Sequence, residues 1–290
     1  MPAKRIILCA TALLFLKGSY LPPATHAEAG PPEITLPLAN QSVRFAIIGD
    51  NGNASRAQYE IGEQMERFRQ AVHFDFVLML GDNLYGRKSP ADYKSKFEQP
   101  YKPLLDAGVR FFASLGNHDD PNERFYKPFN MNGQRYYSFR KADATFFALD
   151  STYMDAGQLD WLDRELARSK TTWKICYFHH PLYSDASHGP DLDLRARLEP
   201  IFQKYGVNVV LSGHEHVYER IAPQHGIAYF VLGSSGELRY HDLHPSPLMA
   251  KGFDTDRTFG VLEIGSDGLS FQVVSRVGAT VDSGRLSPLR

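Results

Sequence analysis

Five short apolar segments of this chain each end in a polar motif, and this pattern constrains the fold more than any other feature. The segments are rich in Val, Ile and Phe and have the length of buried strands. Apolar spacing and a Ser-Pro cap predict helices over 57–72, 89–106, 159–166 and 194–205. Strands that alternate with helices are typical of an α/β fold. The five segments cover residues 43–48, 74–80, 109–115, 173–178 and 207–211.

The remainder of the chain predicts further strands within the same domain. A β-hairpin is expected over 136–149, and strands are expected over 227–232, 259–264 and 269–274. No linker rich in Ser, Gly and Pro divides the chain after Pro32. We therefore expect a lead-in over residues 28–42 and a single domain over 43–290.

The N-terminus predicts a secretory signal peptide over residues 1–27. Lys4 and Arg5 precede the apolar run 6–16, and Thr25-His26-Ala27 has the small residues of a cleavage site. A membrane anchor is the alternative, but a spanning helix needs about 20 apolar residues. We expect a secreted or periplasmic protein with no membrane span after cleavage. Cys176 is then the only cysteine, so the mature chain has no internal disulfide.

Composition excludes several classes of protein. Hydrophobic residues make up 43% of the 290 residues, which is too many for a disordered chain. The formal net charge is −1, so no strongly basic surface is expected and no nucleic-acid partner is predicted.

The polar motifs that follow the five segments carry oxygen and nitrogen donors. Each residue alone would more often be a turn or capping residue, or a histidine satisfied inside the core. The carboxyl ends of strands in an α/β sheet meet at one edge, where ligands bind. The five motifs together therefore predict one metal site. Its donors are Asp50, Asp82, Asn117, His179, His214 and His216.

The number of donors predicts two metal ions. Two carboxylates, one amide and three imidazoles exceed the ligands of a single catalytic zinc, but they suit two ions that share a carboxylate. Tyr85 follows Asp82 by three residues. A phenol ligates well only to a cation that strips its proton, and ferric iron is the natural candidate. The alternative is that Tyr85 is a core aromatic residue with a hydrated hydroxyl.

The motifs resemble the five ordered motifs of calcineurin-like metallophosphoesterases. Because its second motif contains a tyrosine, the chain resembles the purple acid phosphatase branch of this family, in particular the small tartrate-resistant type. The resemblance implies a four-layer α/β/β/α sandwich with two mixed sheets, and a catalytic role for the domain over 43–290. The motifs are Gly-Asp-Asn-Gly (49–52), Gly-Asp-Asn-Leu-Tyr (81–85), Gly-Asn-His-Asp (116–119), His-His-Pro-Leu-Tyr (179–183) and Gly-His-Glu-His (213–216).

The resemblance also implies a role for each residue. Ferric iron would be held by Asp50, Tyr85 and His216, and Asp82 would bridge to a second ion. That ion would be divalent iron, zinc or manganese, held by Asn117, His179 and His214. The His-x-Pro pattern of the family selects His179 rather than His180. His118 would lie near the phosphate, and His188 matches a histidine implicated in handling the leaving group.

The expected function is that of an exported acid phosphatase acting on phosphate monoesters of small molecules. A charge of +5 from the ions exceeds −3 from two carboxylates and a phenolate, so the pocket would attract a phosphate dianion. Metal-bound hydroxide would attack in line. A protonated His118 or His188 would assist the leaving group, which favours turnover on the acid side of neutrality.

Two alternatives remain open at the level of the sequence. The first is a phosphodiesterase or nucleotidase on the same scaffold. The second is an exported binding module without catalysis. The sequence specifies neither the substrate nor the oligomeric state.

Overall fold

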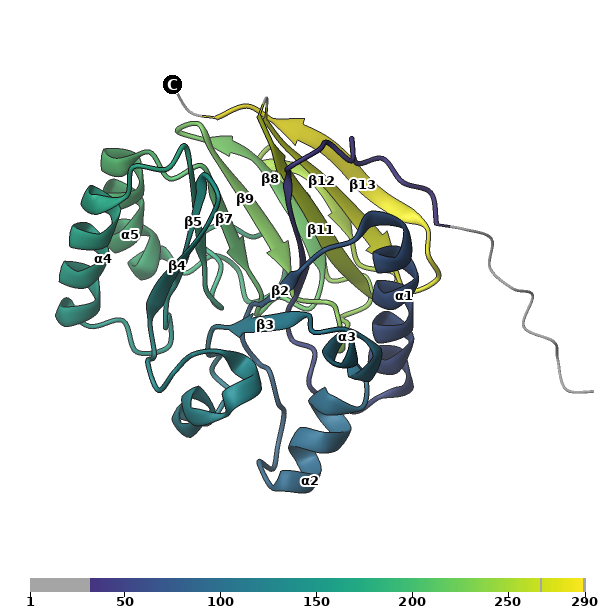
Figure 1. Cartoon of the computed structure of the whole chain (residues 1–290). Coiled ribbons are helices and arrows are strands. Elements are labelled where there is room, and N and C mark those ends of the chain that lie inside the picture. Colours follow the sequence, from purple (N-terminus) through teal and green to yellow (C-terminus); the bar gives the residue numbers. More distant parts are fainter. Residues whose placement is uncertain (1–31, 267, 289–290) are drawn as a thin grey trace, which may run out of the picture. The chain divides into compact units, whose positions relative to one another are not determined.

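Two mixed β-sheets form the centre of the computed structural model, which describes residues 32–266 and 268–288 (Figure 1). The first sheet has the order β13-β12-β11-β1-β2-β3, and the second has the order β10-β8-β9-β7-β6-β5-β4. The strands of the first sheet are β1 (Val43–Ile48), β2 (Phe76–Met79), β3 (Arg110–Ala113), β11 (Thr258–Gly265), β12 (Gly268–Ser275) and β13 (Thr280–Leu286). Those of the second sheet are β4 (Tyr137–Lys141), β5 (Ala144–Ala148), β6 (Trp173–Tyr177), β7 (Val209–Ser212), β8 (Tyr218–Gln224), β9 (Ile227–Leu232) and β10 (Met249–Phe253).

Each sheet has a parallel centre that positions the predicted donors. Strands β1, β2 and β3 are parallel neighbours in the first sheet. Strands β5, β6, β7 and β9 are parallel neighbours in the second sheet. The carboxyl ends of parallel neighbours lie at one edge, so every predicted donor motif follows a strand that ends at such an edge.

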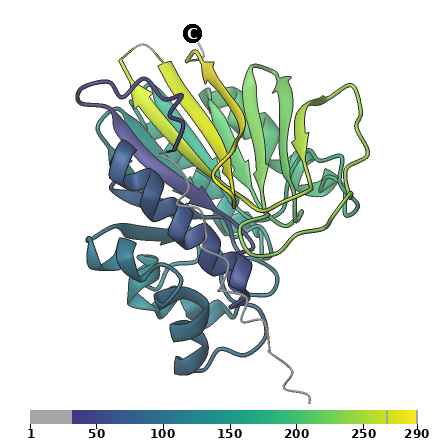
Figure 2. The ribbon, with the colours of Figure 1, turned by 90° about the vertical axis from the view of Figure 1, so that its right-hand side faces the viewer.

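Helices cover the sheets. Helix α1 (Arg56–Val72) packs on the first sheet (Figure 2). Phe68 of this helix meets Phe259 of β11 with ring centroids 5.9 Å apart. Helices α4 (Ala156–Arg168) and α5 (Leu192–Tyr205) lie beside the second sheet (Figure 1) and share a hydrophobic cluster with it. Phe146 of β5 belongs to the core between the sheets, whereas Phe147 belongs to the cluster under these helices. This alternation follows from the opposite directions of successive side chains in a strand. The predicted sandwich of two mixed sheets with flanking helices is therefore confirmed.

The long helix predicted over 89–106 is wrong, because the segment forms three short helices. They are α2 (Pro90–Tyr93), the π-helix η1 (Lys94–Glu98) and α3 (Lys102–Asp106). The helical path is interrupted at Pro100, which has no N–H to continue the hydrogen-bond ladder. The 3₁₀ helices η2 (Pro121–Phe125) and η3 (Lys127–Phe129) follow β3.

Three strands, β8, β10 and β13, lie outside the predicted ranges. Strands β10 and β13 are edge strands with exposed and half-buried side chains, so they lack the apolar pattern that marks a buried strand.

The signal peptide predicted over 1–27 lies outside the described residues. The described part of the lead-in is attached to the first sheet, because the backbone N–H groups of Leu38 and Ala39 donate to Glu263 on β11. None of the helices within 32–266 and 268–288 has the length and apolarity needed to cross a membrane. The domain boundaries at 43 and 290 stay a prediction.

Candidate metal centre

The loops that follow the donor-bearing strands are joined by backbone hydrogen bonds. The Asp50 N–H after β1 donates to the Gly81 carbonyl after β2 at 3.1 Å, and the Gly213 N–H after β7 donates to the His179 carbonyl after β6 at 2.9 Å. The two sheets also meet here, because the His214 N–H donates to Asp50 Oδ2 at 2.8 Å. The edges of both sheets therefore build one site.

Two glycines allow this close approach. A Cβ atom on Gly116 would lie 2.2 Å from Asp82 Oδ1, and a Cβ atom on Gly213 would lie 2.4 Å from Asp50 Oδ2. Both separations are far shorter than a van der Waals contact. The glycines thus leave room for the two carboxylates against the neighbouring loops.

The first group of donors comprises Asp50, Tyr85 and His216. The Tyr85 hydroxyl lies 3.1 Å from Asp50 Oδ1 and 3.1 Å from His216 Nε2. His216 Nε2 lies 3.4 Å from the same carboxylate oxygen. Three donor atoms from three different loops therefore converge on one point.

The second group comprises Asn117, His179 and His214. Asn117 Oδ1 lies 2.9 Å from His179 Nε2 and 3.1 Å from His214 Nδ1, and the two ring nitrogens are 3.2 Å apart. His179 Nδ1 lies 3.0 Å from the Leu80 carbonyl, which fixes the ring orientation. These contacts bring all three predicted donors together.

Asp82 connects the two groups. Its Oδ1 lies 3.5 Å from His179 Nε2, and ligand atoms of Asp50, Asp82 and His179 all lie within 4.8 Å of one another. One carboxylate thus contacts the second group while lying close to a carboxylate of the first, which is the position a bridging ligand would need.

The electrostatics of this cluster favour a bound cation. Burial raises the pKa of Asp50 to about 7, although the contact with His216 opposes the rise. Burial also lowers the pKa of His179 well below its usual value and that of His214 to about 2, so both imidazoles are neutral and keep a lone pair. Buried carboxylates beside neutral imidazoles form a donor set that fits metal ions.

Tyr85 needs a particularly strong cation. Burial, followed by the charges of Asp50 and Asp82, raises the pKa of its phenol far above the usual value. The protein alone therefore keeps the phenol protonated. A cation that ligates this oxygen has to reverse the shift, and a trivalent ion does so more effectively than a divalent one.

His180 lies in the same cluster as the second group. Ligand atoms of His179, His180 and His214 lie within 4.8 Å of one another. The Nδ1 atom of His180 is occupied, because it lies 2.9 Å from the Ser151 hydroxyl. Within the described residues, His180 forms no hydrogen bond with Asn117, whereas His179 contacts both Asn117 and Asp82.

The two predicted catalytic histidines lie beside the donors and are exposed. The His118 N–H donates to Asp82 Oδ1 at 2.9 Å, and its ring lies 5.1 Å from that of Tyr85. The His188 ring lies 4.6 Å from that of His214. The structure therefore brings all nine predicted site residues together.

The comparisons with known proteins decide the family. The protein-family model described as calcineurin-like phosphoesterase matches residues 43–218 of this chain. The chain belongs to the calcineurin-like phosphoesterase family. It is 26% identical to tartrate-resistant acid phosphatase type 5 of Mus musculus, over 77% of this chain and 78% of that protein. It is 24% identical to the Homo sapiens protein of the same name, over 95% of this chain and 97% of that protein. It is 26% identical to purple acid phosphatase 17 of Arabidopsis thaliana, over 72% of this chain and 73% of that protein.

Solved structures show the same fold. Purple acid phosphatase PPD1 from yellow lupin (Lupinus luteus) has a TM-score of 0.70 and 21% identity, over 87% of this chain and 55% of that one. GAP50, described as the anchor in the inner membrane complex of Plasmodium, has a TM-score of 0.75 and 20% identity, over 86% of this chain and 90% of that one. The phosphoesterase fold is thus shared with proteins of different described roles.

Several residues of this calcineurin-like phosphoesterase support the centre without having been predicted. Half-buried Asp119 accepts hydrogen bonds from the N–H groups of Gly116 and Leu84 and so joins two donor loops. Buried Glu215 lies 3.2 Å from His188 Nδ1 through its Oε2. Glu215 stands between the two donor histidines of the His-x-His motif, and this position is the signal that could have identified it. Arg239 also contacts His188, but nothing in its local sequence indicates this.

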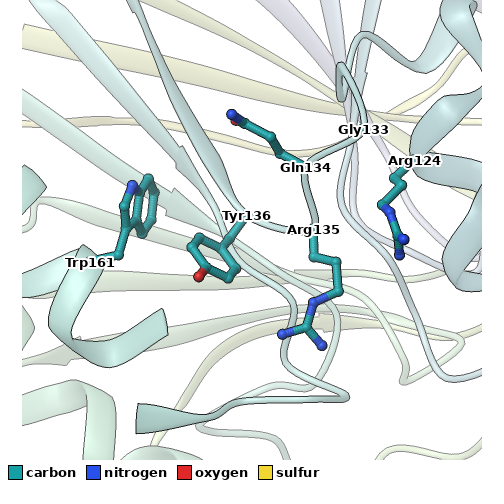
Figure 3. A pocket seen from close by; sticks show the side chains of 6 residues that line it. All are labelled: Arg124, Gly133, Gln134, Arg135, Tyr136 and Trp161. Carbon is teal, nitrogen blue, oxygen red and sulfur yellow. The ribbon is translucent and has the colours of Figure 1, made fainter. Parts of the chain in front are cut away.

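A separate hollow lies in the loop after β3. Its volume is about 460 Å³, and Tyr136 and Trp161 form one side of it with ring centroids 5.0 Å apart (Figure 3). Arg135 in this hollow is paired with Asp155 at 2.9 Å. None of the nine predicted site residues is among its lining residues, which are Arg124, Gly133, Gln134, Arg135, Tyr136 and Trp161.

Proposed function

We propose that this chain is an exported acid phosphatase that hydrolyses phosphate monoesters of small molecules at a dinuclear metal centre. One observation carries the proposal: two groups of three donors lie side by side, and Asp82 contacts one group while lying close to the other. The acid phosphatases among its relatives support the same activity.

Each group of donors suits one ion. Asp50, Tyr85 and His216 would hold ferric iron, because their phenol needs a strong cation. Asn117, His179 and His214 would hold divalent iron, zinc or manganese, with Asp82 shared. When bound, the ions supply positive charge for the phosphoryl oxygens and a nucleophile derived from water.

The protein itself would position the substrate and move a proton. His118 and His188 are the exposed titratable side chains beside the donors. An alkoxide leaving group needs a proton, and an imidazolium can donate one. Activity is therefore expected to be higher on the acid side of neutrality.

The proposed activity is tested with aryl phosphates on the purified mature chain. We expect about two metal ions per chain and faster hydrolysis of p-nitrophenyl phosphate than of the bis-p-nitrophenyl diester. Asp82→Asn should lower the rate by at least about 100-fold because it removes the shared carboxylate, whereas Asp106→Asn, in an exposed ion pair, should leave it unchanged. Faster diester hydrolysis would indicate a phosphodiesterase, and fewer than one ion without hydrolysis would indicate a binding module.

The assignment of ferric iron is tested by the visible spectrum. We expect a charge-transfer band from tyrosinate to iron that disappears in Tyr85→Phe. Tyr93→Phe is the control, because Tyr93 packs against Tyr126, 4.2 Å between ring centroids. A colourless, iron-free and fully active enzyme would show that the assignment is wrong.

A further inference from the structure

Arg239 lies in the loop after β9, between a donor loop and His188. Its backbone N–H donates to the His216 carbonyl at 3.0 Å, which fixes the start of the side chain beside the first group of donors. Its guanidinium reaches His188, with Nη2 2.8 Å from Nε2 and Nη1 3.2 Å from Nδ1. The arginine therefore lies along the edge of the centre.

The other side of His188 is held by a carboxylate. Glu215 is buried, and its Oε2 lies 3.2 Å from His188 Nδ1. His188 Nδ1 thus lies close to both Glu215 and the guanidinium, whereas Nε2 contacts only the guanidinium. The resulting chain of contacts leads from buried Glu215 through His188 to the guanidinium.

The guanidinium has no anionic partner within the described residues. No carboxylate among residues 32–266 and 268–288 forms an ion pair with Arg239, although many other arginines of the chain have one. Glu237, two residues earlier, instead accepts a hydrogen bond from Asn53 at 2.9 Å. An arginine whose side chain contacts only an imidazole, and which lies beside the candidate metal centre, is available to an anion.

On the basis of the proposed function, we propose that Arg239 binds the phosphate of the substrate and thereby selects monoesters over diesters. A guanidinium pairs with two oxygens of one phosphate in a fork geometry. A monoester dianion offers three terminal oxygens and two charges, whereas a diester offers two oxygens and one charge. Charge-assisted hydrogen bonds are about twice as strong as neutral ones, so the dianion displaces the His188 contact. His188 Nε2 is then free to face the leaving group.

The test compares Arg239→Gln and Arg239→Lys with the parent enzyme on an aryl monoester and an aryl diester. Loss of a charge-assisted pair corresponds to about 10- to 100-fold in binding. We expect Arg239→Gln to lower kcat/KM for the monoester by that factor and for the diester by less than about 5-fold. Arg239→Lys should restore part of the preference for the monoester over the diester, because lysine keeps the positive charge but cannot pair with two phosphate oxygens as a guanidinium does.

Calorimetric titration of metal-loaded protein with inorganic phosphate provides a second readout that does not depend on turnover. We expect weaker phosphate binding in Arg239→Gln at unchanged metal content. Arg195→Gln is the matched control, because Arg195 is also half-buried and lies over a ring, that of Tyr183 at 4.6 Å, on helix α5. The phosphate affinity of Arg195→Gln, and its ratio of kcat/KM for the monoester to kcat/KM for the diester, should stay at the parent values.

Two results would overturn the role of Arg239. One is that Arg239→Gln, at full metal content, keeps the parent ratio of kcat/KM for monoester and diester and the parent phosphate affinity. The other is an equal loss for both substrates together with loss of metal, which would show that Arg239 only supports the loop. Failure of the proposed function is distinguishable, because the parent enzyme itself would then hydrolyse neither ester or would hydrolyse the diester faster, while phosphate titration would still report on Arg239.

Discussion

At the scale of single residues, burial determines the charge states around the centre. Glu123, on η2 after the third donor motif, is fully buried and one of its oxygens has no hydrogen-bond partner. Burial, followed by the charge of Asp119, raises the pKa of Glu123 to about 10, against smaller opposing effects of the Asp120 N–H and Lys88. Lys88 Nζ lies 3.7 Å away. The folded protein therefore keeps Glu123 protonated at neutral pH.

This shift predicts how stability depends on pH. The pKa is raised above the value of 4.5 for an unperturbed glutamate, so the folded state holds a proton that the unfolded state releases from about pH 4.5 upward. The free energy of unfolding then falls as pH rises, by about 1 kcal/mol per pH unit for one proton. Glu123→Gln removes this pH-dependent contribution to the free energy of unfolding, because a glutamine side chain does not titrate.

Urea denaturation at pH 5, 6, 7 and 8 measures the effect. Relative to the parent protein, Glu123→Gln should gain about 1 kcal/mol of stability for each pH unit. Glu165→Gln, which changes a partly exposed carboxylate paired with Arg168, should follow the parent curve. Parallel curves for the parent and Glu123→Gln would contradict the assigned protonation.

At the scale of elements, the turns after the strands decide where the donors lie. Asp50, Asp82 and His214 all have positive φ, at 51°, 49° and 69°. Residues with a Cβ atom adopt this conformation at a cost, and such strain is found where surrounding contacts impose it. Here the hydrogen bonds between neighbouring loops impose it, so the turns direct donors of separate strands toward each other.

Gly116→Ala tests the close approach of two of these turns. The added methyl group would lie 2.2 Å from Asp82 Oδ1 and 2.4 Å from its backbone nitrogen, so the carboxylate has to move. We expect metal content to fall and the phosphatase rate to drop about 100-fold, since displacement of a donor by about 1 Å has effects of this size. Metal analysis and the aryl phosphate assay measure both.

The matched control is Gly157→Ala on helix α4, where the nearest atom to the new Cβ would be Asp155 Oδ1 at 3.3 Å. Alanine favours a helix by up to about 1 kcal/mol over glycine, so the folded state and activity should be preserved. If Gly116→Ala retained full metal and activity, the proposed tight contact with Asp82 would be wrong.

At the scale of the whole described domain, an aromatic core joins the sheets that build the site. Phe76 on β2 contacts rings from both sheets. The centroid distances are 5.2 Å to Phe45, 5.9 Å to Phe112, 5.8 Å to Phe139 and 5.4 Å to Phe146. Because β1–β3 and β6–β7 carry donors in different sheets, the metal centre depends on this packing.

Phe76→Ala should lower the free energy of unfolding by about 3–5 kcal/mol, as large cavities in aromatic cores do. Phe125→Ala should change it by less than about 0.5 kcal/mol, because Phe125 is 61% exposed. Chemical denaturation followed by tryptophan fluorescence compares the two. Equal effects of both substitutions would show that the sheets are not held together by this cluster.

Much of the fold and of the centre follows from local sequence. The strand at 227–232 and the helix starting near residue 57 were predicted within one residue, because their apolar patterns are long and bounded by turn or capping residues. The single helix over 89–106 was predicted wrongly, although Pro100, which lacks the N–H needed to continue the hydrogen-bond ladder, was a local signal against it. Strands β10 and β13 were missed because their pairing, rather than their own hydrophobicity, makes them strands.

The sequence by itself determined the chemistry of this protein: carboxylate, phenol, amide and imidazole donors, each at the end of an apolar segment. Short-range rules suffice for this, since a strand and the turn that ends it are local structures. Only the tertiary structure decided that donors from two sheets meet, that Glu215 supports His188, and that Arg239 reaches the same ring. Asp50 and His214 are 164 residues apart, and contacts at such separations exist only once both sheets pack on their common core.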